Sequence, residues 1–290
     1  MKKILLSVAV IAAVAAVVVG VTTAFFSDTE TSTGNTFTAG SLDLKISNTS
    51  YIKDHETGRI VYNQGTSWTA KDLDGEKFFN FSDVKPGDVG EDTIDLTVIN
   101  NDAWACAKLT LTSNNDNTCT EPENDTEVGT EADCSLTGEL AQGIEFVWWA
   151  DDGDNVLESD EEASKYYLGP DSITNLLGND GVLDLTFADK FLNFFDRTRL
   201  DQNQTVKPLE GGKTYYVGKG WCYGNMTLTP VAQDNNKTSG PDQRGTGFEC
   251  DGGVAGNEGQ TDSLTADITF TIEQARNNAG FKCPEHAGLN

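Results

Sequence analysis

The feature that most constrains the fold is a two-residue alternation of apolar and polar side chains in short runs along the chain. In an extended strand, such alternation places the apolar side chains on one face. The runs are separated by clusters of Gly, Asn and Asp, and they comprise residues 41–46, 93–99, 108–112, 144–149, 183–187, 215–218, 226–229 and 264–272. Half-buried strands joined by turns are typical of a two-sheet antiparallel sandwich. The chain is therefore predicted to be all-β.

Helical patterns are few and short. Residues 159–166 begin with acidic side chains, as a helix start often does, and residues 191–195 form a Phe-rich cluster. Both lie within residues 153–209, which we expect to be a partly helical insert between sandwich strands. No second domain boundary is evident, so residues 41–290 are predicted to form one sandwich domain with this insert.

The N-terminus has the three parts of a secretory signal. Lys2 and Lys3 precede an apolar run over residues 4–19, and small side chains follow at residues 20–24. A basic start, an apolar middle and a small-residue end are recognised by signal peptidase, so residues 1–24 are predicted to be removed. The mature protein is then secreted to the extracellular matrix or cell surface.

The cleavage site is expected between Ala24 and Phe25, because Thr22 and Ala24 place small side chains at the two positions that the peptidase reads. An alternative is that residues 4–21 stay in place as a membrane anchor, since this run is long enough to span a bilayer. Both interpretations put the rest of the chain outside the cytoplasm.

The charge balance excludes some partners. The chain of 290 residues has a formal net charge of −26 at pH 7. Such a surface repels nucleic acid and anionic membranes. It suits divalent cations or a protein that stays soluble at a cell surface.

Six cysteines in an exported chain are predicted to form three disulfides, because the extracellular environment is oxidising. Spacing leaves several pairings open. The favoured set is Cys119 with Cys134, Cys222 with Cys250, and Cys106 with Cys283. A zinc site is not expected, because the chain has no Cys-x-x-Cys motif and its two histidines, His55 and His286, lie at opposite ends.

The acidic segment 151–162 is the strongest candidate for a binding site. Ca²⁺ takes six to eight oxygen ligands, and a loop crowded with carboxylates around Gly153 can supply them. The predicted ligands are Asp152, Asp154, Asn155 and Glu158, with Asp151, Glu161 or Glu162 assisting. The spacing does not match an EF-hand. The alternative is a solvated acidic turn before a helix, where carboxylates favour the positive end of the dipole.

Four segments together resemble one known family. They are Phe-Phe-Ser-Asp-Thr-Glu at 25–30, Gly-Asn-Thr-Phe-Thr-Ala-Gly-Ser-Leu-Asp-Leu at 34–44, the Lys-Pro-Gly-Asp turn within 81–88, and the strand at 94–101. In this order the chain resembles the TasA/camelysin (CalY) family of secreted biofilm-matrix proteins. The resemblance implies a jelly-roll sandwich that assembles into extracellular fibres, as related archaeal pilins do.

The implied assembly is donor-strand addition. Residues 25–40, with the apolar side chains Phe25, Phe26 and Phe37, would leave their own subunit and complete an open sheet edge in the next. Self-association is thus the expected partnership, with matrix polysaccharide or other envelope proteins as further partners. The alternative is a monomeric or anchored adhesion protein in which these aromatic residues cover their own core.

The resemblance also brings an enzyme hypothesis, because camelysin-like relatives are classed as metalloproteases. A zinc protease needs clustered imidazoles around an open coordination position, commonly as His-Glu-x-x-His. Neither His55 nor His286 has a second histidine nearby in the sequence. We therefore expect no catalytic activity.

Overall fold

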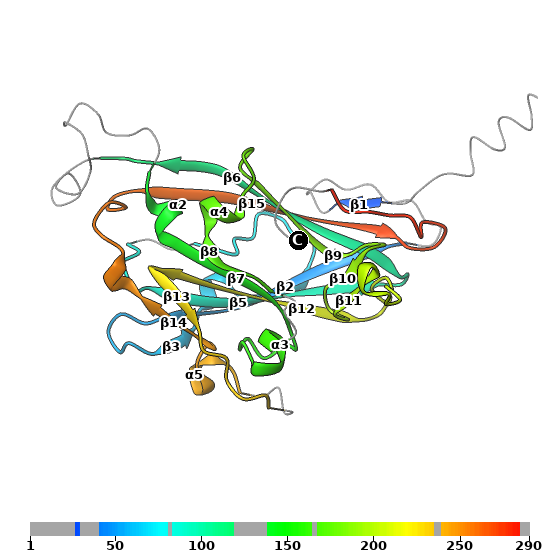
Figure 1. Ribbon diagram of the computed structural model, residues 1–290, viewed down its shortest axis with the longest axis horizontal. Helices are drawn as coiled ribbons and strands as arrows, with labels where there is room; N and C mark the ends of the chain where they lie inside the picture. Colours follow the sequence, from blue (N-terminus) through cyan, green and yellow to red (C-terminus); the bar gives the residue numbers. More distant parts are fainter. Residues whose placement is uncertain are drawn as a thin grey trace, which may run out of the picture.

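The computed structural model describes residues 27–29, 41–80, 83–118, 138–163, 167–234 and 239–284 (Figure 1). The predicted signal segment, its predicted cleavage site and the side chains Phe25, Phe26 and Phe37 lie outside the described residues, as do Cys119 and Cys134. Within the described part, no helix combines the length and apolar character that a bilayer crossing requires.

Two antiparallel sheets pack face to face, which confirms the predicted sandwich (Figure 1). The first sheet has the order β1 (Ser27–Thr29), β15 (Ser263–Gln274), β6 (Ala103–Asn115), β9 (Val182–Ala188), β10 (Leu192–Asn193) and β11 (Thr198–Arg199). The second has the order β3 (Ile60–Tyr62), β2 (Asp43–Lys53), β5 (Val89–Ile99), β12 (Thr214–Tyr223), β7 (Ile144–Asp151) and β8 (Tyr167–Ser172), and β4 (Trp68–Lys71) also pairs with β2.

A two-stranded ribbon and several short helices complete the described fold. The ribbon consists of β13 (Asn225–Leu228) and β14 (Phe248–Asp251). The helices are α2 (Leu140–Gly143), α3 (Ser159–Ala163), α4 (Ile173–Leu176) and α5 (Pro241–Arg244), with single 3-10 turns at η1 (Gln64–Thr66), η3 (Leu200–Gln202) and η4 (Gly252–Val254).

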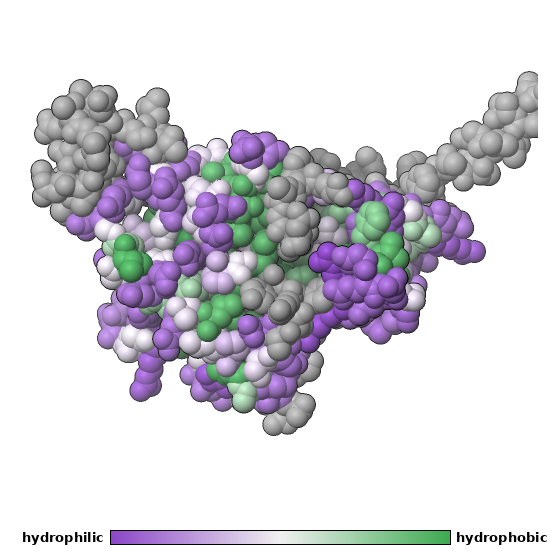
Figure 2. Space-filling model, in the orientation of Figure 1, coloured by the Kyte–Doolittle hydropathy of each residue, from purple (hydrophilic) through white to green (hydrophobic). Residues whose placement is uncertain are grey.

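The main core lies between the two sheets and follows the predicted alternation. On β5, Ile94, Leu96 and Val98 face inward, and on β15 Phe270 and Ile272 do the same. Each such side chain contributes roughly 1.5–3 kcal/mol when fully buried. Polar side chains cover much of the outer surface, as the purple areas of Figure 2 show.

A second, smaller core lies on the outer face of the second sheet, where the β13–β14 ribbon covers it. On β7, Trp148 belongs to the inter-sheet core and Trp149 to the outer one, and both are buried. The expectation that residues 144–149 are buried on one face only was therefore wrong. Trp148, Trp149 and Trp221 are each at most 3% exposed, so these indole rings serve as core side chains.

The segment 153–209 differs from the insert that we expected. It contributes β8 to the second sheet and β9 to the first, so it is part of the sandwich itself. The alternation of Leu183, Leu185 and Phe187 explains this, because all three point into the inter-sheet core. Among the described residues of the segment, the helical elements are α3, α4 and one 3-10 turn.

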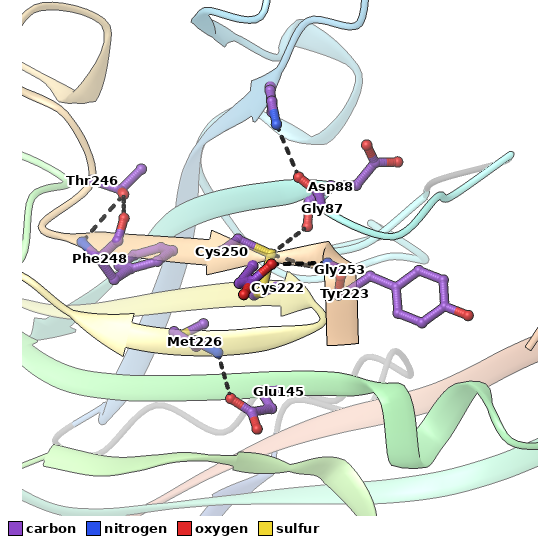
Figure 3. The surroundings of a disulfide bond; sticks show 12 residues. Gly87, Asp88, Glu145, Cys222, Tyr223, Met226, Thr246, Phe248, Cys250 and Gly253 are labelled. Carbon is purple, nitrogen blue, oxygen red and sulfur yellow. Dashed lines mark hydrogen bonds between the residues drawn. A yellow bond between two sulfur atoms is a disulfide. The ribbon is translucent and has the colours of Figure 1, made fainter. Parts of the chain in front are cut away.

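Two disulfides are described, and their pairings are those that the sequence favours. Cys222 on β12 is bonded to Cys250 on β14, which ties the ribbon to the outer face of the sheet (Figure 3). Beside it, Met226 N donates to Glu145 Oε2 at 2.7 Å. Cys106 on β6 is bonded to Cys283, which fastens the C-terminal segment to the first sheet.

Candidate functional site

The acidic loop begins where β7 ends, at Asp151, and continues into α3. Gly153 and Asn155 have positive φ values of 109° and 68°, a conformation that Gly and Asn adopt most readily. The side chains of Val156 and Leu157 are fully buried, so they anchor the middle of the loop. The nearest carboxylates on either side, those of Asp154 and Glu158, are consequently buried rather than solvated.

Asp151 organises the first half of the loop. Its Oδ2 accepts hydrogen bonds from Thr93 Oγ1 at 3.0 Å and Gly153 N at 3.0 Å, and its Oδ1 accepts one from Trp149 Nε1 at 3.2 Å. The Asn155 amide group donates to Thr49 O at 2.7 Å and, at 3.0 Å, to Glu91 Oε2. This predicted ligand thus uses its amide group to join the loop to β2 and β5.

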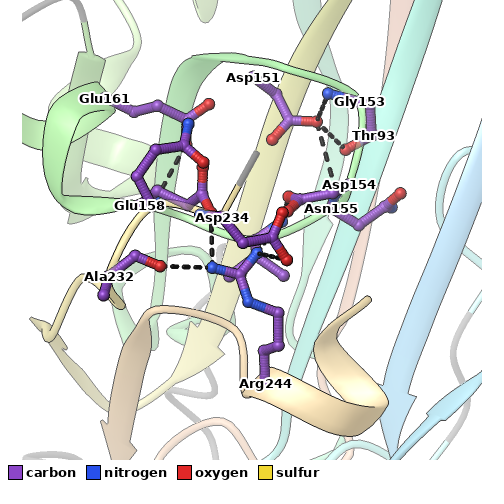
Figure 4. A network of polar contacts seen from close by, with 12 residues as sticks. Thr93, Asp151, Gly153, Asp154, Asn155, Glu158, Glu161, Ala232, Asp234 and Arg244 are labelled. Atoms are coloured by element: carbon purple, nitrogen blue, oxygen red, sulfur yellow. Dashed lines mark hydrogen bonds and ion pairs between the residues drawn. The ribbon is translucent and has the colours of Figure 1, made fainter. Parts of the chain in front are cut away.

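Arg244 of α5 pairs with the second half of the loop (Figure 4). Its guanidinium lies 2.5 Å from Asp154 Oδ2 and 2.5 Å from Glu158 Oε1. The same group donates to Ala232 O at 2.6 Å and lies 3.3 Å from Asp234 Oδ2. The side chains of Asp154 and Glu158 are 1% and 0% exposed, so this is a buried ion-pair network.

The carboxylates form two overlapping groups whose ligand atoms lie within 4.8 Å of one another. Asp152 is common to both groups. One group adds Asp151 and Glu161, and the other adds Asp154 and Glu158. The predicted residue Glu162 belongs to neither group; it lies in α3, where its backbone N donates to Glu158 O at 3.0 Å.

Crowding of buried acids changes their protonation. Burial, reinforced by neighbouring carboxylates, raises the pKa of Asp151 to about 6, that of Asp154 to about 7 and that of Glu161 to about 10. Burial also raises the pKa of Glu158. A bound cation would lower these pKa values, because it stabilises the ionised form of each ligand.

Sequence reasoning found the acidic loop but missed its partners. Thr93, Glu91 and Arg244 all come from distant parts of the chain. Arg244 is one of few arginines in an acidic protein and lies 90 residues from Asp154, so no local pattern connects the two.

A second candidate site is the outer edge of β15. The backbone of β1 pairs antiparallel with it, with Ser27 opposite Glu273, Asp28 opposite Ile272 and Thr29 opposite Thr271. The pairing covers one end of β15 only (Figure 1). Along residues 263–270, no described strand lies on this side of β15, whereas β6 pairs with its other side throughout.

Comparison with known families gives a match to the N-terminal region, which includes β1 and all of β2. Residues 1–56 match the family model described as camelysin metallo-endopeptidase. The resemblance seen in the N-terminal motifs is thereby confirmed for this region. No curated protein matches the chain. The camelysin match covers the predicted signal segment, the predicted donor segment and β2, while the acidic loop lies beyond it.

The camelysin family, with its TasA-like members, is one of secreted and cell-surface proteins. Its printed description also names a metallo-endopeptidase activity. The metal-binding candidates among the described residues consist of carboxylates alone, a donor set that suits Ca²⁺ or Mg²⁺. His55 is half exposed with its Nδ1 3.5 Å from Asp88 Oδ1, and His286 lies outside the described residues.

Proposed function

We propose that the chain is the subunit of a secreted extracellular fibre, in which residues 25–40 of one subunit pair with β15 of the next. The observation that carries this proposal is the β1–β15 pairing. It supports two requirements of donor-strand assembly: the N-terminal segment adopts a strand, and the edge of β15 accepts it in an antiparallel register.

The same pairing can form within one subunit or between two. Exchange of an identical element between protomers preserves its contacts and therefore needs little free energy. Within one subunit, the described residues of β1 pair with residues 271–273 of β15. A strand arriving from a neighbour could extend along residues 263–270, where no described strand pairs with the outer backbone N–H and C=O groups of β15. Such a head-to-tail contact propagates into a filament.

Other strand edges of the sandwich are less suited to this role. In the second sheet, β8 contains Pro170, which lacks a backbone N–H, and β3 and β4 are short. In the first sheet, β11 has two residues. Among the described strands, β15 is thus the long strand whose outer edge can pair with an incoming strand.

Crosslinking distinguishes a filament from a closed monomer. Ser27 lies opposite Glu273, so the pair Ser27→Cys and Glu273→Cys should form a disulfide wherever β1 meets β15. Assembly by strand exchange predicts a ladder of covalent multimers on a non-reducing gel, and each single variant is the control. Crosslinked monomer alone, with no multimers at high protein concentration, would refute the proposal. Deletion of residues 25–30 should likewise abolish filaments in negative-stain images while leaving a folded monomer.

We also propose that the acidic loop holds a structural divalent cation, with Ca²⁺ as the best candidate. Arg244 already neutralises the charges of Asp154 and Glu158. An added cation would therefore bind most favourably beside Asp151, Asp152 and Glu161. At a free concentration of 100 times its Kd, Ca²⁺ would stabilise the fold by about 2.7 kcal/mol.

The test for the cation is a melting curve of the full chain in CaCl₂ and in chelator. We expect a higher Tm with Ca²⁺, a loss of that increase in Asp152→Asn, and its retention in Asp201→Asn, whose exposed side chain lies outside the loop. Equal Tm values of the unmodified chain in CaCl₂ and in chelator would reject the site.

A further inference from the structure

A lysine and an aspartate face each other inside the inter-sheet core. In the register of the second sheet, Lys219 on β12 lies directly opposite Asp92 on β5. Their side chains are 0% and 1% exposed. Val217 and Ile94, two residues along each strand, belong to the same core, so the pair points between the sheets.

Aromatic rings enclose the lysine amine. Lys219 Nζ lies 3.4 Å from the centroid of the Phe79 ring and 5.5 Å from those of Phe78 and Trp148. These rings exclude water from the pair. Burial lowers the pKa of Lys219, which favours the neutral amine, the form that can act as a nucleophile.

The two groups form an ion pair that has no further polar partner. Lys219 Nζ is 2.8 Å from Asp92 Oδ2. Apart from this contact, the Nζ atom and both Asp92 carboxylate oxygens have no hydrogen-bond partner among the described residues. The ion pair therefore leaves Asp92 Oδ1 and the remaining Nζ donors unsatisfied, which is costly in a dry core.

We propose that Lys219 and Asp92 condense into an intramolecular amide that covalently joins β12 to β5. The reactive state is the neutral amine beside the neutral carboxylic acid, which differs from the ion pair by transfer of one proton between them. The Nζ lone pair attacks Asp92 Cγ, the Cγ–Nζ bond forms and the bond from Cγ to the hydroxyl oxygen breaks. The hydroxyl leaves with one proton from Nζ as water, so no oxidant, reductant or further reactant takes part.

Two features of the site favour this reaction. The strand register holds the amine and the carboxyl group in contact, which converts a reaction between separate molecules into one within a fixed geometry. The product also removes two charges from the core and replaces them with one amide. The crosslink would fasten two neighbouring central strands of the sheet, independently of whether the chain forms fibres.

Mass spectrometry of the full chain tests the proposal. After reduction of the disulfides, the folded protein should be lighter than its sequence by one water molecule, and digestion should yield a branched peptide joining Lys219 to Asp92. Asp92→Asn should be lighter than its own sequence by one ammonia, because the same amide forms. Lys219→Met and Asp92→Ala should have their full masses.

Lys213→Met is the control, since Lys213 is exposed and precedes β12; this variant should keep the crosslink. Two separate, unmodified peptides carrying Lys219 and Asp92 in the folded parent protein would overturn the proposal, and this result does not depend on whether any variant folds.

Discussion

Removal of the Arg244 guanidinium should destabilise the protein strongly. In Arg244→Met, Asp154 and Glu158 lose a cation that lies 2.5 Å from each, while their side chains stay almost completely buried. Breaking one partner of a buried ion pair costs about 3–5 kcal/mol, because the remaining charge is left without compensation. We therefore expect a loss in this range in the free energy of unfolding at alkaline pH, where Asp154, whose pKa is raised to about 7 by burial, is ionised.

The assay is urea unfolding followed by tryptophan fluorescence, in the presence of chelator so that no cation replaces the guanidinium. Arg199→Met is the matched control. Arg199 pairs with Asp201 at 3.1 Å, but their side chains are 35% and 64% exposed, so about 0–1 kcal/mol is expected. The loss in Arg244→Met should also shrink at acid pH, where the two carboxyl groups become protonated. Equal losses in both variants would refute the reasoning.

Two further predictions concern pH and packing. The pKa of Asp151 is raised to about 6 and that of Asp154 to about 7, so the folded state binds more protons than the unfolded state between about pH 4 and about pH 7. In the presence of chelator, the free energy of unfolding should therefore fall as the pH rises through this range. Urea curves across this range that show constant or rising stability would contradict this. Gly218→Ala should lower stability by roughly 1–3 kcal/mol, because a Cβ there would overlap the Trp149 indole; an unchanged melting temperature would show that the outer core can adapt.

The N-terminal motifs predicted the family resemblance, and the alternating runs predicted most of the strands. Alternation in residues 93–99 and 264–272 indicated strands, and the structure has β5 and β15 there. It failed for residues 144–149, because β7 is buried on both faces once the β13–β14 ribbon covers the sheet. A strand that is buried on both faces shows no alternation between an inner and an outer side.

The acidic loop, like the fold, could be predicted from the sequence only in part. Its carboxylates are close in sequence, and a turn brings them together, so local spacing was enough to indicate them. Its counter-ion Arg244, and the opposition of Lys219 to Asp92, depend on contacts across 90 and 127 residues. Local patterns follow from the geometry of one strand or turn, whereas such pairings arise when sheet register and loop packing bring distant strands together.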